Sequence, residues 1–399
     1  MANLTTVIPL FFFAKRYLVL KALGTLMSLV FAFAYSTELG IVNRSILAYV
    51  LTLNIMIWIF LTSGTTLTLR KNRPELSSQD FASFRSLILV QSLLGVFFFT
   101  IGMLLFSIHK EPISVYLFLL GYLYFLMSGL ARVLVEVSIA YLDFKLSGYL
   151  ECLAVIIQIV SYFVVFRSLD VTIAVRLMLS FIFSYLVISF IFLLKMRFVL
   201  NRRGIFTSPL KFWKKTNGNH SIGISLGVMD RMDKLIVAFI FPTGILAKYS
   251  VMSSLISYFR FIPEFVSRVL IAKKETIFAE IKKHARILFI GLLFFGLFYV
   301  LLVRSVIAIF LGQNWILAIS IYFLFGIQEI LRGAYQLAIN QTIKQGIVRS
   351  AKYLPLLMVL IALSITALTT HFYGLIGVPI AFSMAYIFAI LTARRSLRN

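Results

Sequence analysis

Residues 172–215 read TIAVRLMLSFIFSYLVISFIFLLKMRFVLNRRGIFTSPLKFWKK, an apolar run followed at once by a basic one. Residues 172–194 contain a single charged side chain, Arg176, and are long enough to cross the roughly 30 Å hydrocarbon core of a bilayer as a helix. Residues 195–215 then carry seven lysines and arginines. This boundary is typical of a transmembrane helix that ends in the cytoplasm, because cytoplasmic loops collect Lys and Arg.

The same alternation of apolar spans and short loops extends along the whole chain. Of its 399 residues, 61% are hydrophobic and 13% are charged, and the mean hydropathy is +1.00. A soluble domain cannot bury so large a share of apolar side chains. The sequence therefore predicts an all-α integral membrane protein with about twelve transmembrane helices. We expect the spans at about 17–35, 44–66, 86–107, 113–132, 147–166, 172–194, 220–240, 247–267, 287–309, 315–335, 353–370 and 374–392.

Lysine and arginine are divided unequally between the two sides of these spans. Of the 38 basic residues, 28 lie at the termini or in the loops of one side, whereas only Arg44, Lys110 and Arg167 lie on the other. This bias places both termini in the cytoplasm. In a soluble chain a net charge of +24 would indicate nucleic acid, but here it belongs to loops beside an anionic leaflet. We therefore expect membrane lipids, and no nucleic acid, as partners.

An internal repeat of about 200 residues divides the chain. Arg70 after the second span lies 203 positions before Lys273, and Arg132 after the fourth lies 200 before Arg332. Each half has six spans and begins on the cytoplasmic side, which predicts two lobes related by a parallel pseudo-twofold. The predicted organisation is an N-terminal lobe at 1–198, a basic linker at 199–218 and a C-terminal lobe at 219–399.

Such a pair of repeats is typical of transporters, in which the substrate lies between the lobes and rocking gives alternating access. The predicted outer loops are too short to hold a substrate for an enzyme acting at that face. No nucleotide-binding loop of the form G-x-x-x-x-G-K-[ST] is present. The four histidines lie in loops or at span ends, and Cys152 is the only cysteine, so we expect no metal site and no cofactor.

Charged residues inside the spans are the candidates for function. Each costs about 2.5–3.5 kcal/mol on insertion scales, so it needs a partner or a water-filled cavity. The basic members are Lys21, Arg231, Lys234, Arg260 and Arg332, and the acidic ones are Asp230, Asp233, Glu264 and Glu329. Cations at least match acids, which suits an anionic cargo such as a phosphate or diphosphate, because Arg can hold phosphate oxygens bidentately.

The seventh span has the densest set of these charges. Arg231 lies about 11 residues into the span, or about 16 Å, which is close to the bilayer midplane. Asp230 and Lys234 are four residues apart and can pair on one helix face, whereas Arg231 and Asp233 lie on different faces. The set can therefore line an aqueous cavity or form structural pairs, and both interpretations stay open. Glu329 and Arg332 are three residues apart and can pair likewise.

Several short motifs resemble those of one transporter superfamily. Gly64-Thr-Thr-Leu-Thr-Leu-Arg70 closes the second span, and Asp233-Lys234-Leu-Ile is followed by Tyr249-Ser250-Val251 at the start of the eighth. Pro263 lies near the end of that span. These features resemble the multidrug/oligosaccharidyl-lipid/polysaccharide exporter superfamily, and within it the Wzx-type O-antigen repeat-unit flippases. The chain departs from the pattern at Ala247, where Gly is usual.

The resemblance implies a MATE-like fold without enzymatic activity. It implies a flippase in the bacterial inner membrane that moves an undecaprenyl-diphosphate-linked oligosaccharide to the outer leaflet, with polysaccharide polymerase machinery as a further partner. On this interpretation the diphosphate is held by the deep cations Lys21, Arg231, Lys234, Arg260 and Arg332. A coupling ion or proton is then held by the acids Asp230, Asp233 and Glu264.

Two other functions compete with this interpretation. One is another secondary transporter, such as a drug or lipid exporter, although an exporter of cationic drugs should favour acids in its spans. The other is a membrane glycosyltransferase of the O-antigen polymerase or ligase type, which typically has a long outer loop that this chain lacks.

Overall fold

The fold is described here from a computed structural model of the whole chain. It describes residues 4–72, 78–140, 144–195, 208–257, 296–344 and 348–396. These residues form α-helices with short 3₁₀ and π-helical turns and contain no strand, so the predicted all-α class is confirmed. The chain divides into two compact units, Asn3–His220 and Ser221–Asn399, which we call unit 1 and unit 2.

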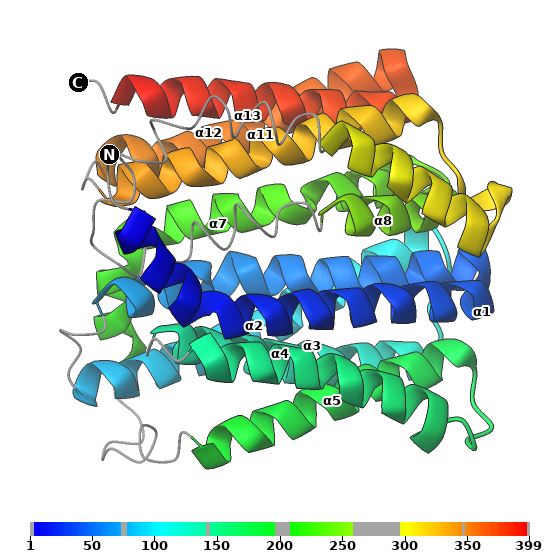
Figure 1. Cartoon of the computed structure of the whole chain (residues 1–399), viewed down its shortest axis with the longest axis horizontal. Helices are drawn as coiled ribbons and strands as arrows, with labels where there is room; N and C mark the ends of the chain where they lie inside the picture. Colours follow the sequence, from blue (N-terminus) through cyan, green and yellow to red (C-terminus); the bar gives the residue numbers. More distant parts are fainter. Residues whose placement is uncertain are drawn as a thin grey trace. The chain divides into compact units, whose positions relative to one another are not determined.

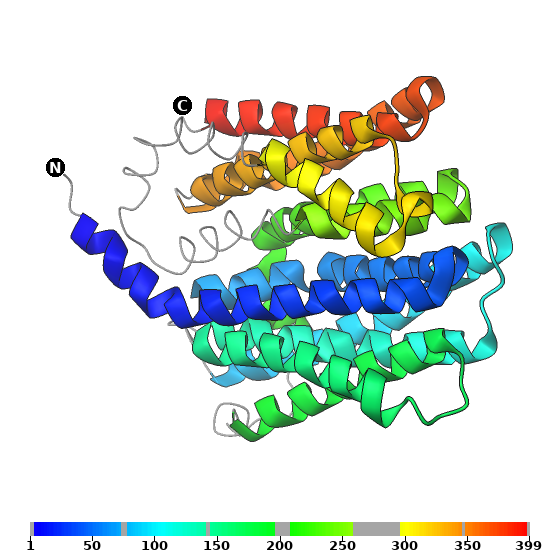
Figure 2. The ribbon, with the colours of Figure 1, turned by 45° about the vertical axis from the view of Figure 1, so that its right-hand side comes forward.

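Unit 1 is built from long helices that run lengthwise beside one another (Figures 1 and 2). The helices are α1 (Leu4–Asn72), α2 (Ser78–His109), α3 (Val115–Ala140), α4 (Phe144–Val160), α5 (Ile173–Lys195) and the start of α7 (Pro209–Ile240). A five-residue π-helix, η2 (Ser161–Val165), continues α4.

Helix α1 consists of two helical segments, which we call its two arms. Gly40 interrupts its helical backbone with a φ of 70° and a ψ of 175°, a conformation that residues with a Cβ rarely adopt. The chain reverses there, so the arm after Gly40 runs back beside the arm before it (Figure 1). The two arms correspond to the first two predicted spans, 17–35 and 44–66, and the outer loop predicted between them is reduced to this bend.

Unit 2 has the same all-helical construction. It contains the end of α7, α8 (Thr243–Ser257), a helix at Gly296–Leu311, η4 (Gln313–Trp315), α11 (Ile319–Lys344), α12 (Val348–Tyr373), η5 (Gly374–Ile376) and α13 (Gly377–Ser396). Helices α12 and α13 form an antiparallel hairpin, and α11 packs along α13. The hairpin turns at Gly374, which has a φ of 57°.

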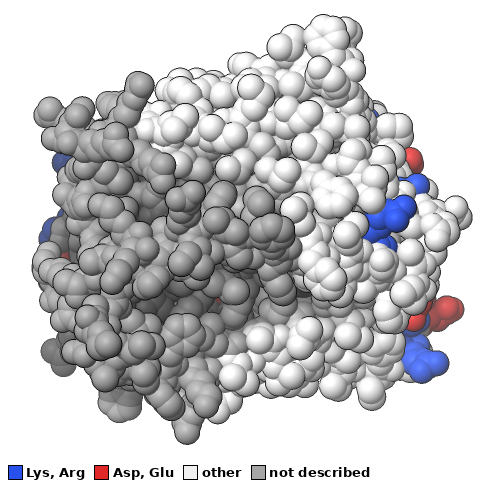
Figure 3. Space-filling view, turned by 45° about the horizontal axis from the view of Figure 1, so that its top comes forward, with Lys and Arg blue, Asp and Glu red and all other residues white. Residues whose placement is uncertain are grey.

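The surface of the described residues is that of a membrane protein. Six helical segments are long and apolar enough to cross a bilayer, and the segments Ala22–Leu69 and Leu357–Ala393 each include a reversal of the chain. Leucine and phenylalanine side chains such as Leu93, Phe97 and Phe190 are largely exposed. On the face in Figure 3, the described surface is almost free of charge except toward the margins of the view. A water-soluble protein would not expose so much contiguous apolar area.

The helices extend beyond the predicted spans at several ends. Helix α2 continues past the predicted 86–107 at both ends, and α7 begins at Pro209. Residues 209–218, which we expected to belong to the linker, are therefore helical and form the beginning of α7. These helix ends contain too many charged and polar residues for a hydropathy pattern to assign them to a span.

Close packing inside unit 1 depends on glycine and on tryptophan. A Cβ on Gly129 of α3 would lie 1.7 Å from Cε2 of Trp58 on α1, so the indole occupies the space that any other residue would need. The Trp58 Nε1–H donates to the carbonyl oxygen of Phe125 at 2.8 Å. Small residues at such crossings let helices approach closely in membranes, where packing rather than the hydrophobic effect drives association.

Candidate functional site

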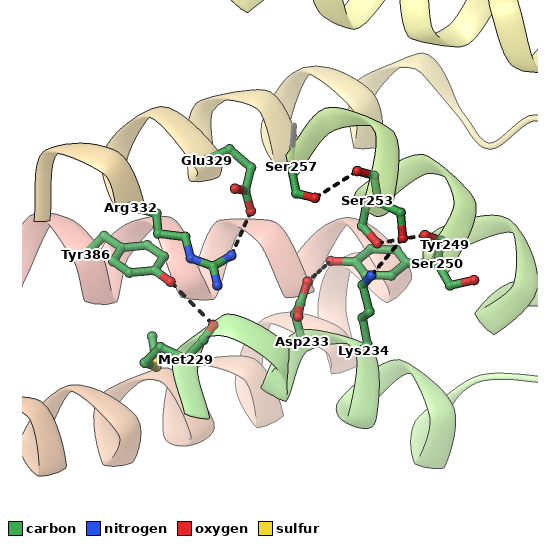
Figure 4. Close-up of polar contacts among 11 residues, drawn as sticks. Met229, Asp233, Lys234, Tyr249, Ser250, Ser253, Ser257, Glu329, Arg332 and Tyr386 are labelled. Carbon is green, nitrogen blue, oxygen red and sulfur yellow. Dashed lines mark hydrogen bonds and ion pairs between the residues drawn. The ribbon is translucent and has the colours of Figure 1, made fainter. Parts of the chain in front are cut away.

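The described interior of unit 2 holds charged side chains on α7. Asp233 and Lys234 expose only 2% and 5% of their surface. The hydroxyl of Tyr249, on α8, donates to Oδ2 of Asp233 at 3.0 Å. The ammonium group of Lys234 donates to Oγ of Ser254 at 3.2 Å, so adjacent residues of α7 are both tied to α8 (Figure 4). Burial of charge is costly, and these hydrogen bonds are the kind of compensation that it needs.

A second charged pair lies on α11. Arg332 Nη1 and Glu329 Oε1 are 2.9 Å apart, and both side chains are almost completely buried. The predicted pairing of these two residues is confirmed. The neutral amide of Gln328, next to Glu329, is also fully buried, and neither its oxygen nor its nitrogen has a hydrogen-bond partner among the described residues.

Tyrosines surround these charges. Tyr249 packs edge-on against Phe325 with ring centroids 5.6 Å apart, and Tyr335 packs against Tyr386 at 5.8 Å. The Tyr386 hydroxyl donates to the carbonyl oxygen of Met229 at 3.4 Å, which links α13 to α7 (Figure 4). Unit 2 therefore contains a polar interior contributed by α7, α8, α11 and α13. We call Asp233, Lys234, Tyr249, Gln328, Glu329, Arg332 and Tyr386 the unit 2 polar cluster.

The charges of this cluster balance in sign. It contains two carboxylates, Asp233 and Glu329, and two cations, Lys234 and Arg332. Oδ1 of Asp233 and Oε1 of Gln328 have no hydrogen-bond partner among the described residues. A buried acceptor of this kind calls for a proton, a cation or a water molecule. Oδ1 of Asp233 can therefore accept a further hydrogen bond or a proton, and Oε1 of Gln328 a further hydrogen bond.

The structure describes some of the predicted site residues and not others. Three of them, Asp233, Lys234 and Arg332, belong to the interior of unit 2. Arg231 is half-buried on α7. Four predicted residues are not described at the level of the side chain: Arg260 and Glu264 lie outside the described residues altogether, and Lys21 and Asp230 are described only as positions on α1 and α7.

Sequence reasoning gives no role to Gln328 and Tyr386. Both are uncharged, and a Gln or Tyr in a span is common enough that neither stands out from the pattern. Tyr249 enters the sequence pattern only as part of a motif, and its bond to Asp233 depends on how α8 packs on α7. Among the described residues no group of three or more His, Cys, Asp or Glu side chains could hold a metal ion.

The two helical units, the apolar surface and the buried charged side chains define a class, the polytopic α-helical membrane proteins. No model of a known protein family matches the chain. No curated protein sequence matches it either. Solved structures do match, and along nearly the whole chain.

One such structure is lipid II flippase MurJ in an inward closed conformation, which has a TM-score of 0.68 and 17% identity and covers 98% of this chain and 88% of its own. The MATE multidrug transporter DinF-BH has a TM-score of 0.66 and 13% identity, covering 100% and 96%. A mutant of the Vibrio cholerae MATE transporter VcmN has a TM-score of 0.56 and 16% identity, covering 97% of each chain. At these identities the likeness establishes the fold, and the MATE-like fold that we predicted is confirmed.

Proposed function

We propose that this protein is a flippase that moves a diphosphate-linked lipid oligosaccharide, of the O-antigen repeat-unit kind, from the inner to the outer leaflet by alternating access. The observation that carries the proposal is the likeness to lipid II flippase MurJ over 98% of this chain. The three solved structures reported above are named as a flippase or as transporters, so we propose no enzymatic activity.

The charge pattern supports an anionic cargo. We propose that Arg231, Lys234, Arg260, Lys21 and Arg332 form the cationic lining that holds the diphosphate. Of these, Lys234 and Arg332 lie in the described interior of unit 2, where a low dielectric strengthens attraction to phosphate. An inside-negative membrane potential would favour outward movement of the anion by about 2.3 kcal/mol per charge per 100 mV.

The acids are proposed to couple transport to an ion gradient. Asp233 accepts a hydrogen bond at Oδ2, while its Oδ1 has no hydrogen-bond partner among the described residues. A buried carboxylate with one occupied and one unoccupied oxygen can bind a proton or a sodium ion reversibly. Asp230 and Glu264 are proposed as further members of the same coupling set.

The proposed setting is a bacterial inner membrane with both termini in the cytoplasm, as the distribution of Lys and Arg favours. There the product would be a lipid-linked unit on the outer face, which is the substrate that a polysaccharide polymerase consumes. We therefore retain polymerase machinery as a proposed partner.

A multidrug exporter is the second candidate, because DinF-BH and VcmN are MATE transporters of similar fold. A cationic drug would be better held by an excess of buried acid. The unit 2 polar cluster has no such excess, because its two carboxylates are matched by two cations.

Deletion of the gene in its own host tests the proposal. Surface polysaccharide would be measured together with the sidedness of the lipid-linked unit, using a reagent that cannot cross the membrane. We expect loss of polymer and accumulation of single units that the reagent cannot reach. Units that reach the outer face but stay unpolymerised would support a polymerase instead, and a normal surface would favour a different cargo.

A further inference from the structure

The end of unit 1 at which α1 reverses contains a cluster of aromatic and charged side chains. We call it the Gly40-end cluster, and it consists of Phe31, Tyr35, Glu38, Arg44, Tyr162 and Arg176. The Arg44 guanidinium lies over the Tyr35 ring at 4.9 Å from its centroid, and that of Arg176 lies 5.9 Å from the Tyr162 ring. Phe31 contacts both tyrosine rings edge-on, with centroids 5.2 and 5.4 Å apart.

Arg44 is buried, and two of its three guanidinium nitrogens lack a hydrogen-bond acceptor among the described residues. Only 5% of its surface is exposed, and its Nε and Nη1 have no hydrogen-bond partner among the described residues. Nε of Arg176 is in the same condition, and so is Oγ of Ser36, which is 1% exposed. Since buried donors on a charged group are costly to leave unpaired, an acceptor from outside the described chain would stabilise this arrangement.

Glu38 is the acid of the cluster, and it forms no ion pair with either arginine. Glu38 accepts a hydrogen bond from the Tyr162 hydroxyl. Among the described residues, neither Arg44 nor Arg176 has an ion pair within 4.0 Å. The cluster therefore holds two guanidinium groups against one carboxylate, and its surplus charge is positive.

We propose that the Gly40-end cluster binds a phosphoryl group of a membrane lipid, with Arg44 as the principal donor. Arg presents several N–H groups in a plane that matches phosphate geometry, and stacking on Tyr35 fixes that plane. Tyr162 lies on the π-helix η2, a distortion that is frequent at functional sites. The distribution of Lys and Arg assigns this end to the outer side, where a flipped lipid would leave the protein. The exit of a flipped lipid at this end rests on the proposed function, whereas the assignment of the end to the outer side and the binding of a phosphoryl group do not.

Native mass spectrometry of the full-length purified protein tests the proposal. The probe is phosphatidylglycerol, and the matched control ligand is a diacylglycerol with the same acyl chains and no phosphate. We expect the wild type to retain phosphatidylglycerol in preference to diacylglycerol. Arg44→Gln should weaken that binding by about tenfold or more, as loss of charged hydrogen bonds implies. Arg167→Gln removes the same charge from an exposed position at the same end and should change nothing.

Equal binding of phosphatidylglycerol by folded Arg44→Gln protein and the wild type would overturn the proposal. If Arg44→Gln does not fold, Arg44→Lys decides the matter, because it keeps the charge but loses the planar guanidinium. Weaker binding then supports the proposal, and unchanged binding overturns it. Inorganic phosphate supplies the same phosphoryl chemistry without a lipid. If inorganic phosphate raises the melting temperature of the wild type but not of the Arg44 variant, and the wild type shows no preference for phosphatidylglycerol, the site binds an anion. The proposal that a membrane lipid supplies the phosphoryl group would then be overturned.

The lipid-binding experiment and the gene deletion test different claims, so either claim can be overturned while the other stands. Lipid binding is measured on purified protein that need not transport anything. A protein that binds phosphatidylglycerol through Arg44 but whose deletion leaves surface polysaccharide intact would retain the phosphoryl site and lose the proposed function.

Discussion

Tyr249 on α8 and Asp233 on α7 share a 3.0 Å hydrogen bond in the interior of unit 2, where Tyr249 is completely buried and Asp233 almost so. The bond joins two consecutive helices through a carboxylate that would otherwise lie in an apolar medium. It thereby links the stability of unit 2 to the residue that we propose for ion coupling, which makes it the first contact to test.

Removal of this hydroxyl by Tyr249→Phe should lower the stability of the protein. The buried carboxylate loses its donor, and the expected loss is about 1–3 kcal/mol. Thermal unfolding of the purified protein in detergent measures the change. Tyr322→Phe is the control, since it removes a buried hydroxyl of the same unit that has no carboxylate partner among the described residues. Equal shifts in the two variants would show that the bond to Asp233 is not stabilising.

Replacing one partner of the α11 ion pair should lower the stability of the protein more than replacing both partners. Glu329→Met leaves the guanidinium of Arg332 buried opposite an apolar side chain, with an expected loss of about 3–5 kcal/mol. The double variant Glu329→Met/Arg332→Met removes both charges and should recover much of that loss. A thermal unfolding comparison of the single and double variants is decisive, and a double variant less stable than the single one would contradict the prediction.

Close helix packing in unit 1 should make Gly129 intolerant of substitution. In Gly129→Ala the new Cβ would meet the Trp58 indole at 1.7 Å, and overpacking typically costs about 1–3 kcal/mol. Gly121→Ala is the matched control on the same helix, because its Cβ would lie at an ordinary 3.4 Å from Phe99. Retention of folded protein after detergent extraction measures the difference. A second change, Trp58→Leu, should restore part of what Gly129→Ala loses.

The sequence predicts those parts of the structure that depend on hydropathy and helix spacing. The spans follow from apolar runs, and the pair Glu329–Arg332 follows from a three-residue separation on one helix. Contacts between helices are beyond such patterns. Nothing in the sequence distinguishes Gly129, which must accommodate Trp58, from Gly121, which need not. The sequence places Arg44 beside an exposed outer loop, yet it is buried, because the chain reverses at Gly40 within a single bend.

Transport itself should depend on the cations that we assign to the diphosphate. Combined Arg231→Ala and Arg260→Ala substitutions should abolish surface polysaccharide while the protein still reaches the membrane at normal abundance. Polysaccharide is measured in a deletion strain that carries the variant on a plasmid. Arg167→Ala, an exposed arginine of unit 1, is the control for loss of charge alone. An unchanged surface in the double variant would show that these two arginines do not hold the substrate.

Substitution of Asp233 by Asn should separate folding from coupling. The amide keeps the size of the side chain and an oxygen that can accept from Tyr249, so the stability of unit 2 should change little. The side chain can no longer hold a proton or bind a cation as a carboxylate does. Flipping in inverted membrane vesicles should therefore lose its response to an imposed proton or sodium gradient. Tyr249→Phe keeps the carboxylate and should retain that response at reduced stability. If Asp233→Asn vesicles respond to the gradient as the wild type does, the coupling group is another residue, and Asp230 becomes the next one to substitute.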